Sequence, residues 1–230
     1  MGFPLKSGSQ FISVDSKKKI LGQYNNNLAA ITQTYIKNLL EFELSKENWS
    51  LSRVRNKEAP QPEIEKGISW LLNSKKNVGQ PTKVDLLDLH CQLGERQSNS
   101  CRQNQVPALT PNHLPTEPPL ILPAVDRFFE WVSSPSFGEM HPIEQMTISQ
   151  MRLTEIFPFE QHSQITSSLF SYRFLVDNGL LLPFYETHQL SVFSEALDKA
   201  FLFSTQALVQ LNTQACEKAQ DCVLKVLAEN

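Results

Sequence analysis

Cysteine is scarce in this chain, and the few cysteines lie far apart. Only four of the 230 residues are cysteines, and none forms a Cys-x-x-Cys pair. Small disulfide-stabilised domains and zinc fingers need more cysteines, or cysteines at closer spacing, so both classes are excluded. We expect reduced and mostly buried thiols at Cys91, Cys101, Cys216 and Cys222, and no metal site.

The chain also lacks long apolar runs and a strong excess of either charge. No apolar run is long enough to cross a bilayer, and the residues after Met1 lack the apolar core of a secretory signal. The formal net charge of -3 provides no general attraction to nucleic acid or to an anionic membrane. We therefore predict a cytoplasmic location, or delivery as a secreted bacterial effector, with neither nucleic acid nor membrane as a partner.

Amphipathic segments with helical spacing make up most of the chain. Hydrophobic residues form 40% of it, which is enough for one substantial core. The spacing predicts an all-α, single-domain helical bundle. Helices are expected from residue 25 to about 45, after Pro60, over 83–93, from Pro123, from Pro142 to about Phe157, from Thr166 or Ser167 to Asn178, and over most of 192–227.

A helix, a turn and a second helix at residues 147–179 form the centre of this pattern. The first helix must end near Phe157, because Pro158 lacks an amide donor and clashes with the turn before it. Gly179 favours a left-handed cap at the end of the second helix. The unpaired amides at the start of that second helix make the turn a natural site for an anion.

This turn resembles an eroded form of the signature of the Fic (Fido) family, His-Pro-Phe-x-(Asp/Glu)-Gly-Asn-Gly-Arg-x-x-Arg. Proteins of that family transfer AMP from ATP to protein hydroxyls. The preceding elements are also similar: a Leu-x-x-Leu-His helix ending at His90, a Pro-rich segment, an amphipathic helix and the pair His141-Pro142. The resemblance implies a helical bundle of the Fic type.

The same resemblance implies that the chemical groups of the signature are lost. Phe157 stands where the family has its histidine base, and Gln161 stands where an acidic residue holds Mg²⁺. Ile165 and Ser168 replace the two arginines that pair with phosphate. The triplet His-Ser-Gln at 162–164 replaces Gly-Asn-Gly, so side chains occupy a turn whose backbone must approach phosphate closely.

Two further features of Fic proteins have weak counterparts here. The family carries a β-hairpin flap that pairs with the target peptide, and residues 105–109 with Arg102 and Val106 resemble it, although the prolines nearby disfavour a strand edge. Many members also carry a regulatory helix whose glutamate pairs with the second signature arginine. Glu47 is the candidate for that glutamate, but with Ser168 at the arginine position it would have no charged target.

Four parts of the chain are expected from these patterns. They are a flexible N-terminal arm (1–24), an N-terminal helix with a remnant of a regulatory helix (25–59), a Fic-like core (60–214) and the end of a C-terminal helix (215–230).

The eroded signature predicts a non-catalytic binding or regulatory module, a pseudoenzyme with no cofactor and with another protein as partner. The alternative is a protein nucleotidyltransferase with non-standard residues, which alone would need ATP and Mg²⁺. Its candidate acid and base are Glu160 and His162, and its candidate nucleotide contacts are Ser163, Gln164 and Thr166. A third hypothesis, a helical DNA-binding or scaffolding protein, is disfavoured for DNA by the net negative charge.

Overall fold

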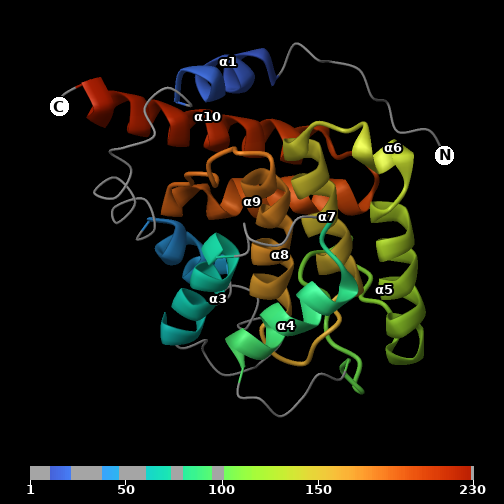
Figure 1. The fold of residues 1–230 in the computed structure, drawn as a ribbon. Coiled ribbons are helices and arrows are strands. Elements are labelled where there is room, and N and C mark those ends of the chain that lie inside the picture. Colours follow the sequence, from blue (N-terminus) through green and yellow to red (C-terminus); the bar gives the residue numbers. More distant parts are fainter. Residues whose placement is uncertain (1–10, 22–37, 47–60, 74–79, 95–100, 229–230) are drawn as a thin grey trace.

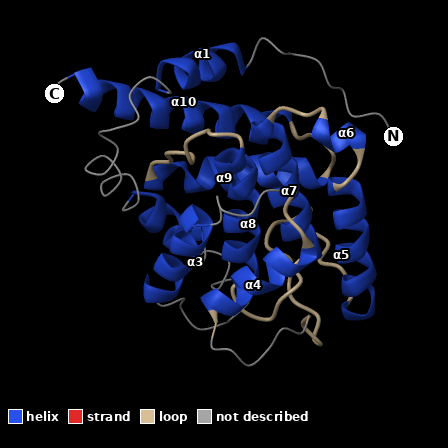
Figure 2. Ribbon diagram, viewed as in Figure 1, coloured by secondary structure: helices blue, strands red, loops and turns tan. Residues whose placement is uncertain are grey.

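The computed structural model describes residues 11–21, 38–46, 61–73, 80–94 and 101–228. Within these ranges the chain is helical and contains no strand, which confirms the all-α prediction (Figure 2). The helices are α1 (Ile12–Leu21), α3 (Gln61–Asn73), α4 (Lys83–Leu93), α5 (Pro118–Val132), α6 (Pro135–Gly138), α7 (Pro142–Ile156), α8 (Ser163–Asp177), α9 (Leu190–Phe201) and α10 (Gln206–Ala228), with a further helical stretch at 38–46 and a 3-10 turn at Thr187–Gln189.

Helix α8 lies at the centre of the bundle (Figure 1). Every residue from Ser163 to Val176 is buried, because α8 packs against α7, α3 and α4. Helix α7 packs in turn against α5, α9 and α10, and α10 carries α1 on its outer side. The turn between α7 and α8 is therefore held between two of the most buried helices of the protein.

Part of the expected N-terminal arm is a packed helix. Phe11 and Val14 are three residues apart, so they lie on one face of the first helical turn and are both buried. Lys17 pairs with Asp221 of α10 at 2.8 Å, and the Phe11 ring stacks on His141 with ring centroids 3.9 Å apart. Residues 12–21 thus differ from the flexible arm expected from composition.

Two helices begin earlier than the sequence predicted. Helix α5 begins at Pro118, because a proline at the first helical position needs no amide donor. Pro123, the predicted start, lies in the interior of this helix. Helix α8 begins at Ser163 with His162 as its N-cap, so the prediction of Thr166 or Ser167 as the cap was wrong. The Thr166 and Ser167 hydroxyls instead donate to backbone carbonyls four residues back, at 2.6 and 2.7 Å.

Other boundaries are confirmed. Helix α4 begins with a capping box between Thr82 and Asp85, and α7 begins with a capping box between His141 and Glu144. Helix α7 ends at Phe157, which adopts a left-handed conformation with φ 48° directly before Pro158. The four cysteines are free thiols, but only Cys216 is buried and the other three are half-buried, so the expectation of mostly buried thiols was wrong.

Residues 101–117 form a loop, as the polar and proline-rich sequence there predicts, and the small β-hairpin that the resemblance suggested at 105–109 is not formed. The Arg102 guanidinium is buried and donates to the carbonyls of Phe157 at 2.7 Å, of Asn104 at 2.7 Å and of Thr116. These bonds fasten the loop to the C-terminal end of α7. Two of the carbonyls, those of Asn104 and Thr116, belong to the loop itself, so Arg102 satisfies part of the loop backbone without a strand pairing.

Candidate functional site

The turn that joins α7 to α8 has the phenyl ring of Phe157 at the position that the resemblance aligns with the histidine base of the Fic signature. Phe157 is 3% exposed and forms a small apolar cluster with Val106 and Leu109. Its ring also lies beside that of His113, with centroids 6.3 Å apart. A buried phenyl ring has no atom that accepts a proton, so position 157 contributes packing only.

His90 of α4 holds the other side of this turn. Its ring stacks on Phe159 with centroids 3.7 Å apart and an interplanar angle of 10°, and its Nε2 lies 3.2 Å from the Gln161 carbonyl. The Gln161 carbonyl requires a proton on Nε2. Burial, opposed by this hydrogen bond, lowers the pKa of His90 to about 4. His90 is therefore a packed histidine that positions the turn, as its isolated occurrence in the sequence suggested.

The candidate acid and base lie in different surroundings. Glu160 and Gln161 are exposed, whereas His162 is 8% exposed and adopts a left-handed conformation with φ 58°. The His162 carbonyl accepts from the amide of Thr166 at 2.9 Å and from its hydroxyl at 2.6 Å. His162 thus starts α8 through its backbone, a role that residue spacing alone does not reveal.

The candidate nucleotide contacts are directed into the protein. Ser163 Oγ accepts from the Phe159 amide at 3.3 Å, and the Thr166 hydroxyl is used within α8. Gln164 is 1% exposed, and neither the nitrogen nor the oxygen of its side-chain amide has a hydrogen-bond partner in the described part of the protein. Ile165, at the first arginine position, is fully buried.

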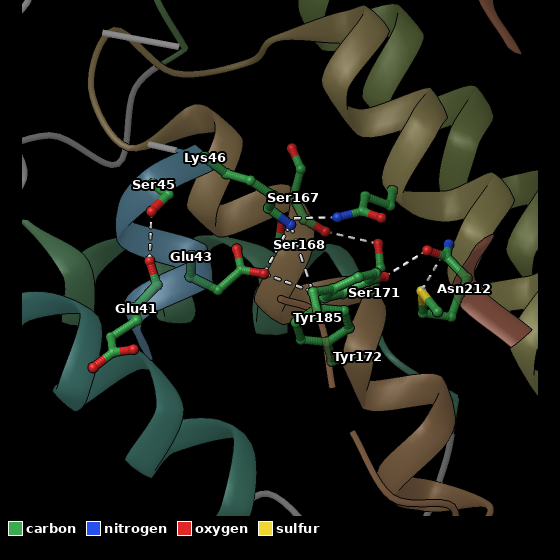
Figure 3. Close-up of polar contacts among 12 residues, drawn as sticks. Glu41, Glu43, Ser45, Lys46, Ser167, Ser168, Ser171, Tyr172, Tyr185 and Asn212 are labelled. Atoms are coloured by element: carbon green, nitrogen blue, oxygen red, sulfur yellow. Dashed lines mark hydrogen bonds and ion pairs between the residues drawn. The ribbon is translucent and has the colours of Figure 1, made fainter. Parts of the chain in front are cut away.

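Ser168, at the second arginine position, lies in a buried polar network with the helical residues 38–46 (Figure 3). Lys46 Nζ donates to Ser168 Oγ at 2.9 Å and pairs with Glu43 Oε1 at 2.7 Å. Gln150 of α7 donates to the same Ser168 oxygen at 2.9 Å, and the Tyr172 hydroxyl donates to Glu43 at 2.6 Å. The network joins three helices through one serine.

Aromatic rings complete the surroundings of this ammonium group. Lys46 Nζ lies 4.8 Å from the ring centroid of Phe193, 5.4 Å from that of Phe42 and 5.7 Å from that of Tyr172. Both charged side chains of the pair are fully buried. Burial, together with the adjacent Glu43 carboxylate, raises the pKa of Tyr172 well above its usual value, so its hydroxyl remains a donor. The cation is therefore compensated by one carboxylate and three ring faces.

Sequence reasoning missed Lys46 and Glu43. An acidic and a basic residue three apart within the apolar stripe of Leu39 and Phe42 was the available indication that both charges are buried. The regulatory candidate Glu47 lies outside the described residues. The helix before it contacts Ser168 through Lys46.

Neither a metal cluster nor a membrane-spanning helix is found in the described ranges. No group of three or more His, Cys, Asp or Glu side chains there could hold a metal ion. None of the helices there is both long and apolar enough to cross a bilayer.

Comparison with solved structures identifies the fold. The chain is similar to amino acids 134–508 of Fic-1 from C. elegans, with a TM-score of 0.73 and 14% identity, over 97% of this chain and 74% of that one. A variant of the same protein gives a TM-score of 0.73 and 13% identity, over 96% and 72%. A Fic family protein from Desulfovibrio desulfuricans G20 gives 0.60 and 13%, over 98% and 77%. No protein-family model matches the sequence, and no curated protein matches it significantly.

Proposed function

We propose that this chain, which has the Fic fold, does not transfer AMP and acts as a non-catalytic binding or regulatory module for another protein. The observation that carries the proposal is the chemistry of the four signature positions. Phe157 and Ile165 are buried and apolar, and Gln161 is a neutral amide. The Ser168 hydroxyl oxygen already accepts hydrogen bonds from Lys46 and Gln150. The base, the metal ligand and both phosphate-binding cations are thus absent together.

The expected loss of rate supports the same conclusion. A general base typically contributes about 10² to 10⁴ in rate, and one preorganised donor to an anion contributes about 10² to 10³. Such contributions are not additive, but here all groups of both kinds are missing. Two of the remaining polar side chains of the turn, Ser163 and Thr166, already bond within the protein.

Nucleotide binding tests the proposal directly. The full chain is titrated with ATP and Mg²⁺ by calorimetry, with an active Fic protein as the positive control. We expect no heat of binding and no transfer of labelled AMP to proteins of a cell lysate. Micromolar affinity for ATP, or labelling that depends on the chain, would contradict the proposal.

One observation favours a second function, that of a protein nucleotidyltransferase with non-standard residues. The buried Gln164 amide at the start of α8 lacks partners in the described part of the protein, and a polar ligand that reached this turn would supply them. ATP and Mg²⁺ would then be the cofactors, with His162 as base. Incubation of a lysate with labelled ATP, UTP and CDP-choline would show labelling that His162→Ala abolishes.

A further inference from the structure

A cleft of about 460 Å³ lies between α5 and α7, outside the signature turn. It is lined by residues of these two helices and by Thr116 of the loop before α5, none of which belongs to positions 157–168. Its volume falls within the range of clefts that bind small ligands or a few residues of a peptide. The two helices run side by side along one edge of the bundle (Figure 1).

The apolar wall of the cleft comes from α5. Phe128 is buried, whereas Trp131 is only partly buried and remains accessible from the cleft. The Trp131 ring is held edge-to-face against Phe137, with centroids 4.7 Å apart, so its orientation is fixed. A rigid, partly exposed tryptophan is the kind of side chain that contributes most to binding energy in protein interfaces.

Two guanidinium groups give the cleft a positive charge. The hydrogen bond of Arg127 to the Pro123 carbonyl, at 3.3 Å, uses only Nε. Arg152 pairs through Nη1 with Glu155 at 2.5 Å. The three charged groups of the lining therefore sum to about one positive charge, in a chain whose formal net charge is -3. The remaining guanidinium donors have the geometry to bind a carboxylate through two hydrogen bonds.

The apolar surface continues beyond the cleft along α5. Leu120 lies one helical turn before Ala124, which lines the cleft, and Leu120 is 50% exposed. A small free acid would fill the cleft but leave Leu120 in water, whereas an extended chain that continued along α5 would cover it.

We propose that this cleft binds a peptide segment of a partner protein in which a carboxylate stands next to a large apolar side chain. The inference rests on the proposed function as a protein-binding module and names the surface and the chemistry of its partner. The carboxylate pairs with Arg127 and Arg152, and the apolar side chain packs on Trp131. Because Glu155 competes for Arg152, it limits the affinity for acids.

Fluorine NMR tests this proposal at a single residue. The full chain is labelled with 5-fluorotryptophan, and the Trp131 signal is assigned with Trp131→Phe. The probes are short, blocked peptides that combine Asp or Glu with Leu, Phe or Trp in both orders, together with the matched set in which the acid is Asn or Gln. We expect at least one acidic peptide to shift the Trp131 signal and its amide counterpart to bind at least about tenfold more weakly. No shift by any acidic peptide, or equal binding of the amides, overturns the proposal.

Charge variants separate binding from mere folding. Arg127→Gln at the exposed rim should lower the affinity for the acidic peptide at least about tenfold. Glu155→Gln should raise that affinity severalfold, because it releases Arg152. Circular dichroism verifies that each variant is folded. Weaker binding of the peptide by Glu155→Gln would contradict the proposal. Phenylacetate serves as a small free acid with an apolar ring, and if it binds as tightly as the best peptide, the ligand of the cleft is not a peptide segment.

The outcome for the cleft is independent of the outcome for the turn. If ATP binds or AMP is transferred while the acidic peptides still shift Trp131, the proposed function fails and the cleft site stands. If ATP does not bind and no peptide shifts the Trp131 signal, the cleft site is contradicted while the proposed function is not.

Discussion

Lys46 Nζ lies 2.9 Å from Ser168 Oγ, although 122 residues separate the two in the chain. The resemblance to the Fic signature aligns Ser168 with the second arginine of that signature. The positive charge near this position is supplied by a different helix and is paired with Glu43 of that helix at 2.7 Å. The buried cation thus contributes to packing, because Glu43 and Ser168 hold it within the protein.

Removing only the cation should destabilise the protein strongly. Lys46→Met leaves the buried Glu43 carboxylate without its cation, and breaking a buried pair in this way typically costs about 3 to 5 kcal/mol. Urea denaturation measures the free energy of unfolding. The matched control is Lys17→Met, which breaks the more exposed pair with Asp221 and should cost less than about 1 kcal/mol. The double variant Glu43→Gln/Lys46→Met should recover much of the loss, and a double variant less stable than Lys46→Met would contradict this account.

Acid should destabilise the protein through two buried histidines. Burial lowers the pKa of His90 and of His113 from the ordinary value of 6.5 to about 4. The unfolded chain therefore binds more protons than the folded chain between these two values. The stabilisation is fully present above pH about 6.5 and is lost as the pH falls toward about 4, with a slope of about 1.4 kcal/mol per pH unit for each histidine.

The His113 ring provides the sharper test of this pH dependence. Its Nδ1 accepts from the Leu109 amide at 3.0 Å and its Nε2 donates to the Thr154 carbonyl at 3.1 Å, so protonation breaks the first bond. We expect His113→Gln to lower stability at neutral pH and to reduce the slope between pH 4 and 6.5, measured by urea denaturation at several pH values. An unchanged slope would show that His113 is not neutral in the folded protein.

Gln164→Leu should stabilise the protein. Both polar atoms of the Gln164 amide are buried without a hydrogen-bond partner in the described ranges, and an unsatisfied buried polar group costs about 1 to 3 kcal/mol. An apolar side chain of similar size removes that cost. Thermal unfolding should show a higher midpoint for Gln164→Leu, whereas the control Ser163→Ala, which removes the acceptor for the Phe159 amide, should lower it. A lower midpoint for Gln164→Leu would mean that the amide has a partner, such as a bound ligand.

Arg102→Gln should release the loop before α5. The guanidinium of Arg102 bonds to carbonyls of the loop and of the end of α7, and hydrogen bonds of charged groups contribute about 1.5 to 3 kcal/mol each. Hydrogen exchange measured by mass spectrometry should rise in residues 101–117 while α8 stays protected. The surface variant Arg127→Gln serves as the control, and equal protection of the loop in both variants would show that Arg102 does not fasten it.

Features that depend on neighbours in the chain were predictable from the sequence. The end of α7 before Pro158, the capping box of Thr82 and Asp85 and the all-α class follow from backbone chemistry and spacing that act within a few residues. The alignment of Phe157, Gln161, Ile165 and Ser168 with the charged positions of the Fic signature is a prediction that rests on the resemblance alone.

Only the tertiary structure decided which of these residues meet. Composition favoured a flexible arm where α1 packs on α10, and the hydroxyls of Thr166 and Ser167 favoured a helix start that packing moved to Ser163. The contact of Lys46 with Ser168 had no local indication, since it forms only when two distant helices bury their faces together. Burial against a distant element outweighs local propensity of a fraction of a kcal/mol per residue, and that is why the sequence determined the helices while the fold determined the site.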